Sequence, residues 1–337
     1  MGTFTSKERI MTIVRRMVRL SIIAWMCGQT NTIGAANINV VWTSEVGQFA
    51  PLWVTKEAKL FEKYGNNVQL IFIQGASSAA AALSSGDAHV GMFSPQVVIS
   101  TPQLDLVMFG RLGNTMDNRV YARKGIKNIK EVKRVAISRF GSNADFAARF
   151  LLQREGLRPD IDVALLQVGN QANRIAAVET NNADAAMLTP PMTLQARKLG
   201  MTLLLDASKL NIPYSSLFFV ARRSYLGKMR PELVNFTKAM IEGVALYKSN
   251  KEFAMKVLSK YMKVQDREVL EENFKEYDFP LKPYPSREYF ELPIQEVGKK
   301  DPKVLKENPD RYTDLSLVKE LESSGFIDKV SQEHRVK

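Results

Sequence analysis

Two stretches of this chain are related in sequence, and this internal repeat constrains the fold more than any other feature. The first covers residues 41–95 and the second residues 135–190. Each opens with a short apolar run followed by Ser-x-x-Gly, and each closes with an apolar run that ends in a hydroxyl residue and a proline. When residues 70–95 are aligned with 165–190, six of 26 positions are identical. This shared order predicts two similar α/β lobes that face each other across a cleft.

Within each copy, apolar runs alternate with segments of helical spacing, which is the pattern of a mostly parallel sheet wrapped by helices. Pro51 fits the first turn of one helix, and Ser77 or Ser78 is expected to cap the next. In the second copy, Ser142 or Asn143 is expected to cap a helix. Strands are predicted over 38–42, 68–73, 88–93, 104–109, 119–122, 135–138, 163–168, 183–188, 202–205 and 217–221, and helices over 51–64, 171–180 and 313–323, among others.

The composition is that of an ordinary globular protein, with 337 residues of which 45% are hydrophobic and 24% are charged. The formal net charge is +12, but the basic residues beyond the N-terminus do not form long blocks. The sequence contains no basic tract with interleaved aromatic residues and no zinc-finger or ribonucleoprotein motif. We therefore expect a basic protein with no nucleic-acid partner, and a nucleic-acid binder is the alternative.

The N-terminus has the pattern of a secretory signal peptide. Residues 1–19 carry five basic side chains and one acidic one, and a short apolar run follows over 20–26. Small residues then precede Ala36, so cleavage is expected after Ala36; a tail or an uncleaved anchor is the alternative. Cleavage would place the mature protein in the periplasm. It would also remove Cys27, the only cysteine of the chain.

Signatures of catalysis and of metal binding are sparse. The only histidines are His89 and His334, and neither has a partner at a spacing suited to a metal site. The sequence has no nucleophile elbow, Walker loop, dinucleotide fingerprint or zinc-protease motif. We therefore expect a binding protein rather than an enzyme, with no cofactor and no metal.

The polar residues that could hold a ligand lie where strands end and helices begin. In a parallel α/β sheet, ligands bind beyond the carboxyl ends of the strands, and helix N-termini there attract anions through unpaired backbone N–H groups. Each copy offers two such junctions, and the hydroxyl–proline pairs lie on the same edge. The candidate contacts are Ser44, Gln48, Gln74, Gly75, Ser77, Ser94, Pro95, Ser138, Arg139, Gly141, Ser142, Asn143, Thr189 and Pro190.

Among these candidates, Arg139 indicates the ligand chemistry most directly, because a guanidinium group pairs well with a carboxylate or a sulfonate. A solvated arginine in a loop is the alternative. For any single serine or asparagine, ordinary helix capping is the alternative to ligand contact. Five aromatic residues are expected to form apolar walls of a small-molecule pocket: Trp42, Phe49, Phe93, Phe140 and Tyr214.

A family resemblance is carried by short motifs spread over residues 37–325. They read Pro-Leu-Trp-Val at 51–54, Leu-Phe-Glu-Lys-Tyr-Gly at 60–65, Gly-Asp-Ala-His-Val-Gly at 86–91, Asn-Ala-Asp-Ala-Ala at 182–186 and Thr-Pro-Pro at 189–191. With them the chain resembles the substrate-binding proteins of ABC importers for nitrate, sulfonate and taurine. These share a superfamily with the thiamine-pyrimidine-precursor (NMT1/THI5-like) binding proteins. The chain departs from the pattern at His89, where an acidic residue is commoner.

The resemblance implies a bilobal periplasmic-binding-protein-like fold of type II, with two α/β lobes joined by a two-segment hinge. Lobe 1 would comprise residues 37–120 and 216–337, and lobe 2 would comprise 121–215. The resemblance also implies a small-molecule ligand, and as partners the permease and ATPase subunits of an ABC transporter at the membrane. We expect the protein itself to be a monomer.

Three hypotheses about the ligand and the activity stay open at this point. The first is a small organic anion, such as a sulfonate or a carboxylate. The second is a neutral heterocycle, such as a thiamine pyrimidine precursor or riboflavin, held between aromatic walls. The third is a biosynthetic enzyme of the same superfamily. Its chemistry consumes an active-site histidine and uses a cysteine-rich segment, and neither has a well-placed counterpart in this chain.

Overall fold

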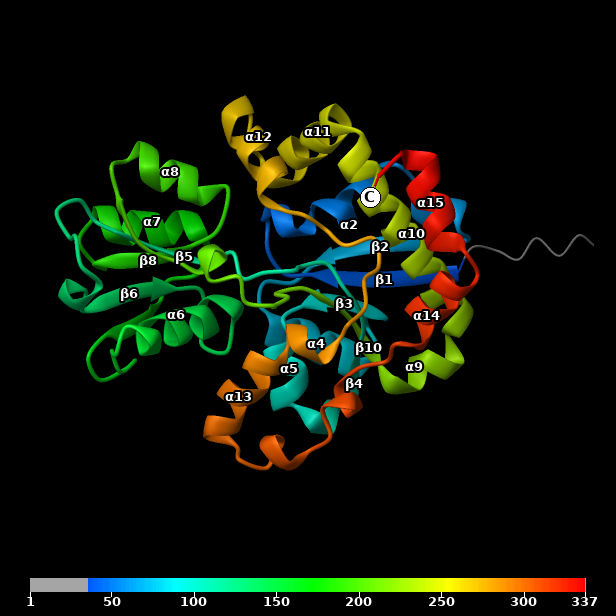
Figure 1. Ribbon diagram of the computed structural model, residues 1–337, viewed down its shortest axis with the longest axis horizontal. Coiled ribbons are helices and arrows are strands. Elements are labelled where there is room, and N and C mark those ends of the chain that lie inside the picture. Colours follow the sequence, from blue (N-terminus) through cyan, green and yellow to red (C-terminus); the bar gives the residue numbers. More distant parts are fainter. Residues whose placement is uncertain (1–35, 337) are drawn as a thin grey trace, which may run out of the picture. The chain divides into compact units, whose positions relative to one another are not determined.

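The computed structural model describes residues 36–336, and its strands form two five-stranded sheets (Figure 1). The first sheet contains β1 (Ala36–Trp42), β2 (Asn66–Phe72), β3 (Val90–Phe93), β4 (Leu106–Arg111) and β10 (Phe218–Arg222), in the order β2-β1-β3-β10-β4. The second contains β5 (Arg119–Ala122), β6 (Arg134–Ile137), β7 (Ala164–Gln167), β8 (Ala185–Leu188) and β9 (Thr202–Asp206), in the order β7-β6-β8-β5-β9.

The two sheets repeat one topology, which confirms the duplicated α/β unit predicted from the sequence. In the first sheet β1 pairs in parallel with β2 and β3, and in the second β6 pairs in parallel with β7 and β8. One antiparallel strand completes each sheet, β10 between β3 and β4 and β5 between β8 and β9. The chain therefore passes between the sheets twice, after β4 and before β10, as expected for a two-segment hinge.

Helices cover both faces of each sheet, and we call a sheet with its helices a lobe. In the first lobe α2, α10 and α11 pack on one face and α4, α5 and α13 on the other; in the second, α6 packs opposite α7 and α8 (Figure 1). The helices are α2 (Ala50–Glu57), α3 (Leu60–Lys63), α4 (Ala76–Ser85), α5 (Pro95–Ser100), α6 (Asn143–Arg154), α7 (Gln171–Glu179), α8 (Met192–Lys198), α9 (Arg223–Lys228), α10 (Arg230–Ser249), α11 (Lys251–Met262), α12 (Arg267–Glu276), α13 (Glu291–Lys300), α14 (Ser316–Ser323) and α15 (Phe326–His334).

Strand β1 shows how the sequence builds this core. Side chains alternate between the two faces of a strand, so Ile38 and Val40 enter the cluster beneath α2 and α10, whereas Val41 enters the cluster on the opposite face. All three side chains are fully buried. A continuous apolar run is thus required because both faces of the sheet are covered.

Several predicted elements differ from those in the structure. The helix predicted over 51–64 is broken into α2 and α3, because Lys59 adopts a left-handed conformation with a φ of 56°. The predicted serine caps of α4 are wrong: its N-cap is Gly75, and no side chain caps it. The cap predicted for α6 is confirmed, because Ser142 accepts the backbone N–H of Asp145. Asn170 caps α7 in the same way, which was not predicted.

Several helices were not expected from the sequence, and α13 is one of them. Pro95 was interpreted only as the end of β3, but it is also the first residue of α5, where its missing N–H costs nothing. Helix α8 follows Pro191 in the corresponding place of the second copy. Helix α15 extends the C-terminal helical region beyond the predicted end at residue 323.

The lobe boundary predicted between residues 120 and 121 falls inside β5, whose four residues all pair with β8. The second sheet therefore begins at Arg119, and the complete assignment of lobe limits stays a prediction. The predicted signal peptide lies outside the described residues except for Ala36, which is the first residue of β1. Within residues 36–336, no helix combines the length and the apolar character needed to cross a membrane.

Candidate functional site

The two lobes are joined by hydrogen bonds at the carboxyl ends of their strands. Gln48 lies after β1 in the first lobe, and its Nε2 donates to Oδ2 of Asp117, just before β5, at 2.5 Å. The hydroxyl of Tyr277, which follows α12, donates to the same Oδ2 at 2.9 Å. Ser216, just before β10, donates to Oε1 of Gln48 at 2.8 Å. Asp117 is therefore fixed through one of its two oxygens.

A second set of bonds centres on Tyr214, whose side chain is fully buried. Gln96 of α5 donates through Nε2 to the Tyr214 hydroxyl at 3.1 Å, and that hydroxyl donates to Oδ1 of Asn143 at the start of α6. Asn143 in turn donates to Oδ1 of Asn118 at 3.1 Å. Asp117 and Asn118 are neighbours in sequence, so both sets form one interlobe network: Gln48, Gln96, Asp117, Asn118, Asn143, Tyr214, Ser216 and Tyr277.

The network reflects the repeat. Gln48 and Asn143 are 95 positions apart, one more than the offset of 94 that aligns Ser44 with Ser138, and each stands near the start of the first helical segment of its copy. Each reaches one member of the Asp117–Asn118 pair in the chain crossing between the lobes. Corresponding regions of the two copies, though not strictly equivalent positions, thus converge on one hinge segment.

Three buried oxygens beside this network have no hydrogen-bond partner among the described residues. They are Oγ of Ser94, Oε1 of Gln96 and Oδ1 of Asp117. Burial raises the pKa of the Asp117 carboxyl, and the hydrogen bonds from Tyr277 and Gln48 oppose that rise in part. Burying a carboxylate without an ion pair destabilises a folded protein. Packing alone therefore does not explain an aspartate at position 117.

Arg139, in the loop after β6, lies against the first lobe. A Cβ atom placed on Gly75 would lie 3.9 Å from Nη1 of Arg139 and 3.8 Å from its Cδ. The guanidinium is exposed and forms no ion pair with any residue of the described range. Its counterpart in the repeat, Glu45, instead pairs with Lys263 at 3.0 Å. The positive charge of Arg139 thus lies at the junction of the lobes without a carboxylate partner in the described range.

The other polar candidates fall into two groups. Some hydrogen-bond within their own lobe: Ser138 donates to Ser142 at 2.7 Å, and Gln171 both donates to the Thr189 hydroxyl and accepts its backbone N–H. Gly141 is exposed and donates its backbone N–H to Oδ2 of Asp145 at 2.8 Å, also within its own lobe. Of the others, Ser44 and Gly75 are half-buried, Gln74 and Ser77 are exposed, and Pro95 and Pro190 are buried. The Pro190 carbonyl lies 3.5 Å from the Tyr277 hydroxyl, so it also faces the network.

The aromatic candidates pack mainly within the cores. The Trp42 ring lies 5.8 Å from that of Phe49 and 5.3 Å from that of Trp53, all within the first-lobe core. The Tyr214 ring stacks on Phe146 of the second lobe at 5.5 Å. Phe93 is buried and Phe140 is 52% exposed. Only Tyr214 among the five predicted walls also joins the interlobe network.

Five network members were not found from the sequence: Gln96, Asp117, Asn118, Ser216 and Tyr277. Gln96 follows the predicted Ser94-Pro95 pair, so recognising α5 would have drawn attention to it. Asp117 and Asn118 lie in the crossover, where the polar composition offered no pattern. Tyr277 comes from a region far along the chain, and nothing local marks it.

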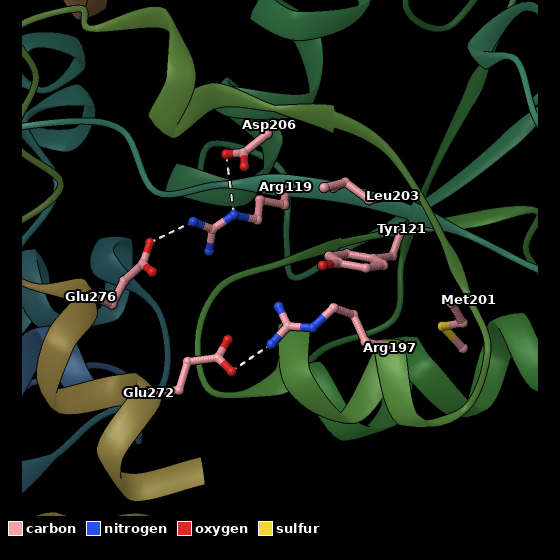
Figure 2. Close-up of a pocket in the computed structure, with 8 residues that line it drawn as sticks. All are labelled: Arg119, Tyr121, Arg197, Met201, Leu203, Asp206, Glu272 and Glu276. Carbon is pink, nitrogen blue, oxygen red and sulfur yellow. Dashed lines mark hydrogen bonds and ion pairs between the residues drawn. The ribbon is translucent and has the colours of Figure 1, made fainter. Parts of the chain in front are cut away.

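A pocket of about 350 Å³ lies elsewhere, where α12 faces the second lobe (Figure 2). Figure 2 shows Arg119 between Asp206 and Glu276, and Arg197 reaching Glu272. All the charged side chains of this pocket are therefore in ion pairs with one another. It offers a ligand no unengaged charge, unlike the interlobe network.

The histidines lie away from the network. His89 precedes β3 at the amino end of the strand, where its Nδ1 accepts the Asn39 N–H at 3.0 Å. His334 lies on α15 beside Ser249 and Glu242 of α10. In the part of the chain that the structure describes, no group of three His, Cys, Asp or Glu residues is arranged to hold a metal ion.

Comparison with known proteins places the chain in a family. Residues 46–254, more than half of the chain, match the family described as NMT1/THI5 like. The Bacillus subtilis (strain 168) protein YtlA is 22% identical over 225 residues, which make up 64% of this chain and 66% of that protein. The match thus spans just under two thirds of the length of this relative.

Solved structures agree with the fold. The alkanesulfonate-binding protein SsuA from Xanthomonas axonopodis pv. citri, bound to MOPS, has a TM-score of 0.68 at 16% identity, over 82% of this chain and 96% of that one. A Candida albicans gene product with the generic periplasmic binding protein fold has a TM-score of 0.66 at 16% identity, over 85% and 95%. The chain belongs to the NMT1/THI5-like family, and its paired five-stranded lobes have the periplasmic-binding-protein fold.

Proposed function

We propose that this protein is the extracytoplasmic solute-binding component of an ABC import system, and that it binds a small organic anion between its lobes. Family membership and the bilobal fold support the class of protein, and the similarity to an alkanesulfonate-binding protein supports the class of ligand. In this role the protein acts in the periplasm and delivers its ligand to a membrane permease that is driven by a separate ATPase.

The main observation in favour of an anionic ligand is the position of Arg139 opposite the start of α4. The N-terminus of α4 has no side-chain cap, so its first backbone N–H groups are open to a ligand. The Arg139 guanidinium approaches Gly75, the N-cap of that helix, from the other lobe. A sulfonate or carboxylate held by both would be bound by both lobes, and binding would then favour their closed arrangement.

The competing functions have less support. A neutral heterocycle requires free aromatic faces; Trp42 and Phe49 pack in the core of the first lobe, and Phe140 is the one predicted aromatic wall that is exposed. An enzyme of this family requires reactive groups at the ligand edge, and both histidines lie away from it. Binding without turnover is therefore the function that the geometry supports best.

Isothermal titration calorimetry with a panel of alkyl sulfonates and carboxylates tests this proposal. The Arg139→Ala variant should bind the best anion about 10- to 100-fold more weakly, because a charge-assisted hydrogen bond is lost. Arg154→Ala, which removes an exposed arginine from the far end of α6, is the matched control and should bind like the unaltered protein. Unchanged affinity in Arg139→Ala would instead favour a neutral ligand.

A further inference from the structure

The segment that joins α12 to α13 (orange in Figure 1) is bonded to both chain crossings between the lobes. We call residues 278–289 of this segment the strap. The crossings are residues 112–118, between β4 and β5, and residues 211–217, just before β10. The strap contains Pro280, Pro283 and Pro285, and each proline fixes its own φ and so limits bending. A stiff segment bonded to both crossings can restrict how the lobes move.

Arg111, the last residue of β4, holds the strap and is only 5% exposed. Its backbone N–H donates to the Pro283 carbonyl at 3.1 Å, and its Nε donates to the Tyr284 carbonyl at 2.7 Å. The guanidinium carbon lies 3.4 Å from the centre of the Tyr289 ring. A guanidinium suits this position because it presents several donors in a fixed plane and stacks on aromatic rings.

The same guanidinium also fixes the first crossing. Its Nη1 donates to the Gly113 carbonyl at 2.6 Å and to Oδ1 of Asn114 at 2.5 Å. Asn114 in turn donates through Nδ2 to the Asp278 carbonyl of the strap at 2.7 Å. In the second crossing, the Ser215 N–H donates to the Tyr289 carbonyl at 3.1 Å. Residues 113, 114 and 215 are therefore all tied to the strap or to the arginine that holds it.

The strap itself is anchored to the first lobe. Lys282 and the Tyr284 hydroxyl bind Glu322 of α14, and Asp278 pairs with Lys248 of α10. Among the described residues, no hydrogen bond or ion pair of the strap reaches the second lobe. The lobes can therefore move apart without breaking the contacts of the strap.

Beyond the strap, both crossings enter the core of the second lobe. Met116 and Tyr214 belong to the hydrophobic cluster of that lobe and are 1% and 0% exposed. Only Thr115 lies between Met116 and the strapped part of the first crossing, and it is exposed and pairs with Pro213 of the other crossing. In the second crossing, Tyr214 is followed directly by Ser215. Thr115 and the junction of Tyr214 with Ser215 thus form a short pivot that can absorb a change in backbone angles.

We infer, on the basis of the proposed function, that the strap confines the opening of the lobes to this pivot, and that Arg111 is the positioning residue that holds it. Without Arg111, residues 113 and 114 would also be free to bend, and the ligand-free lobes would separate further. A wider range of open states makes closure around a ligand less favourable, because more conformational freedom is lost on binding. The strap thus influences affinity from outside the ligand site.

Hydrogen–deuterium exchange and small-angle X-ray scattering of the ligand-free Arg111→Met variant test this inference. Amides of residues 112–115 and 214–216 should exchange about 10-fold faster, because local opening becomes easier there. The radius of gyration should rise, whereas the amides of β1 and β3 should exchange as before. Arg222→Met is the matched control and should change neither measurement, since Arg222 lies over the Tyr225 ring at the far end of β10.

Asn114→Ala is a second variant, which removes the bond to the Asp278 carbonyl and leaves Arg111 in place. It should produce the same local change to a smaller extent, and it provides the test if Arg111→Met does not fold. Faster exchange spread over β1, β3 and β10 would mean that Arg111 only stabilises the first lobe, and unchanged exchange at the crossings would mean that the strap does not restrain them. Either result would overturn the inference, and because no ligand is present, both would leave the anion-binding proposal standing. Failure of the sulfonate and carboxylate panel to bind would count against that proposal alone.

Discussion

At the scale of single residues, Asp117 is the buried carboxyl group with the clearest consequence for stability. Burial raises its pKa, and the hydrogen bonds from Tyr277 and Gln48 oppose that rise only in part. Tyr277, which faces it, has a pKa raised well above its ordinary value by burial and by the charge of Asp117, so it stays neutral near pH 7. Burial of the Asp117 carboxyl therefore lowers the stability of the folded protein at any pH where this group is ionised.

The Asp117→Asn variant should be more stable than the unaltered protein at neutral pH, by a few °C in Tm. A carboxyl whose pKa is higher in the folded state stabilises the protein below its unfolded value, near pH 4, and loses that contribution as pH rises through the folded value. The Tm difference between the proteins should thus grow as pH rises from about 4 and then level off. Calorimetric melts from pH 4 to 8 without ligand measure it. A difference that is constant with pH would contradict the explanation.

At the scale of elements, the two copies begin their helices by different means, although the copies have the same topology. Helix α6 is capped by Ser142, whose Oγ accepts the Asp145 N–H at 3.2 Å and the Ser138 hydroxyl at 2.7 Å. Helix α4 starts at Gly75 without a side-chain cap, and that glycine has a φ of +96°, which other residues rarely adopt. The uncapped start is the one that faces Arg139.

Ser142→Ala should therefore lower the free energy of unfolding by about 1 kcal/mol, because an N-cap hydrogen bond is lost. Ser77→Ala in α4 is the matched control and should change it very little, since this serine is exposed and caps nothing. Denaturant titration of both variants gives the comparison. A similar loss in the two variants would mean that Ser142 does not stabilise α6 as a cap.

At the scale of the whole molecule, α12 connects the lobes through ion pairs. Arg119 of β5 binds Glu276 and Arg197 of α8 binds Glu272 (Figure 2). Lys198 of α8 binds Asp266, just before α12. The Arg119 and Glu276 side chains are only 11% and 20% exposed, whereas Lys198 and Asp266 are about half exposed. Burial protects the first pair from screening by solvent and salt, so it should contribute most to holding the lobes together.

Double-mutant cycles test whether the buried ion pair contributes more to stability than the exposed one. Arg119→Met and Glu276→Gln, alone and combined, should give a coupling energy of about 1–3 kcal/mol in the free energy of unfolding. The same cycle with Lys198→Met and Asp266→Asn should give a much smaller coupling that disappears at high salt, because those groups are solvated. Equal couplings at both positions would show that α12 does not act through its buried end.

The sequence by itself determined the duplicated α/β architecture and the edge at which a ligand is expected. Both follow from local patterns, since apolar runs specify strands and glycine, serine and asparagine mark the strand-to-helix junctions. Gln48 and Asn143 were predicted on that basis, and Tyr214 was predicted as an aromatic wall; all three are network members in the structure. Arg139 was likewise predicted at a junction and lies against Gly75 of the other lobe.

Only the tertiary structure decided which distant side chains these residues contact. Asp117 and Tyr277 are separated by 160 positions and come together because Asp117 lies in the first crossing between the lobes, whereas Tyr277 follows α12, after the chain has returned through β10. No local pattern reports such a contact, since hydrophobic periodicity records which face of an element is buried but not which distant element covers it. The same holds for the unpaired oxygens of Ser94, Gln96 and Asp117, because being unpaired is a property of the packed surroundings.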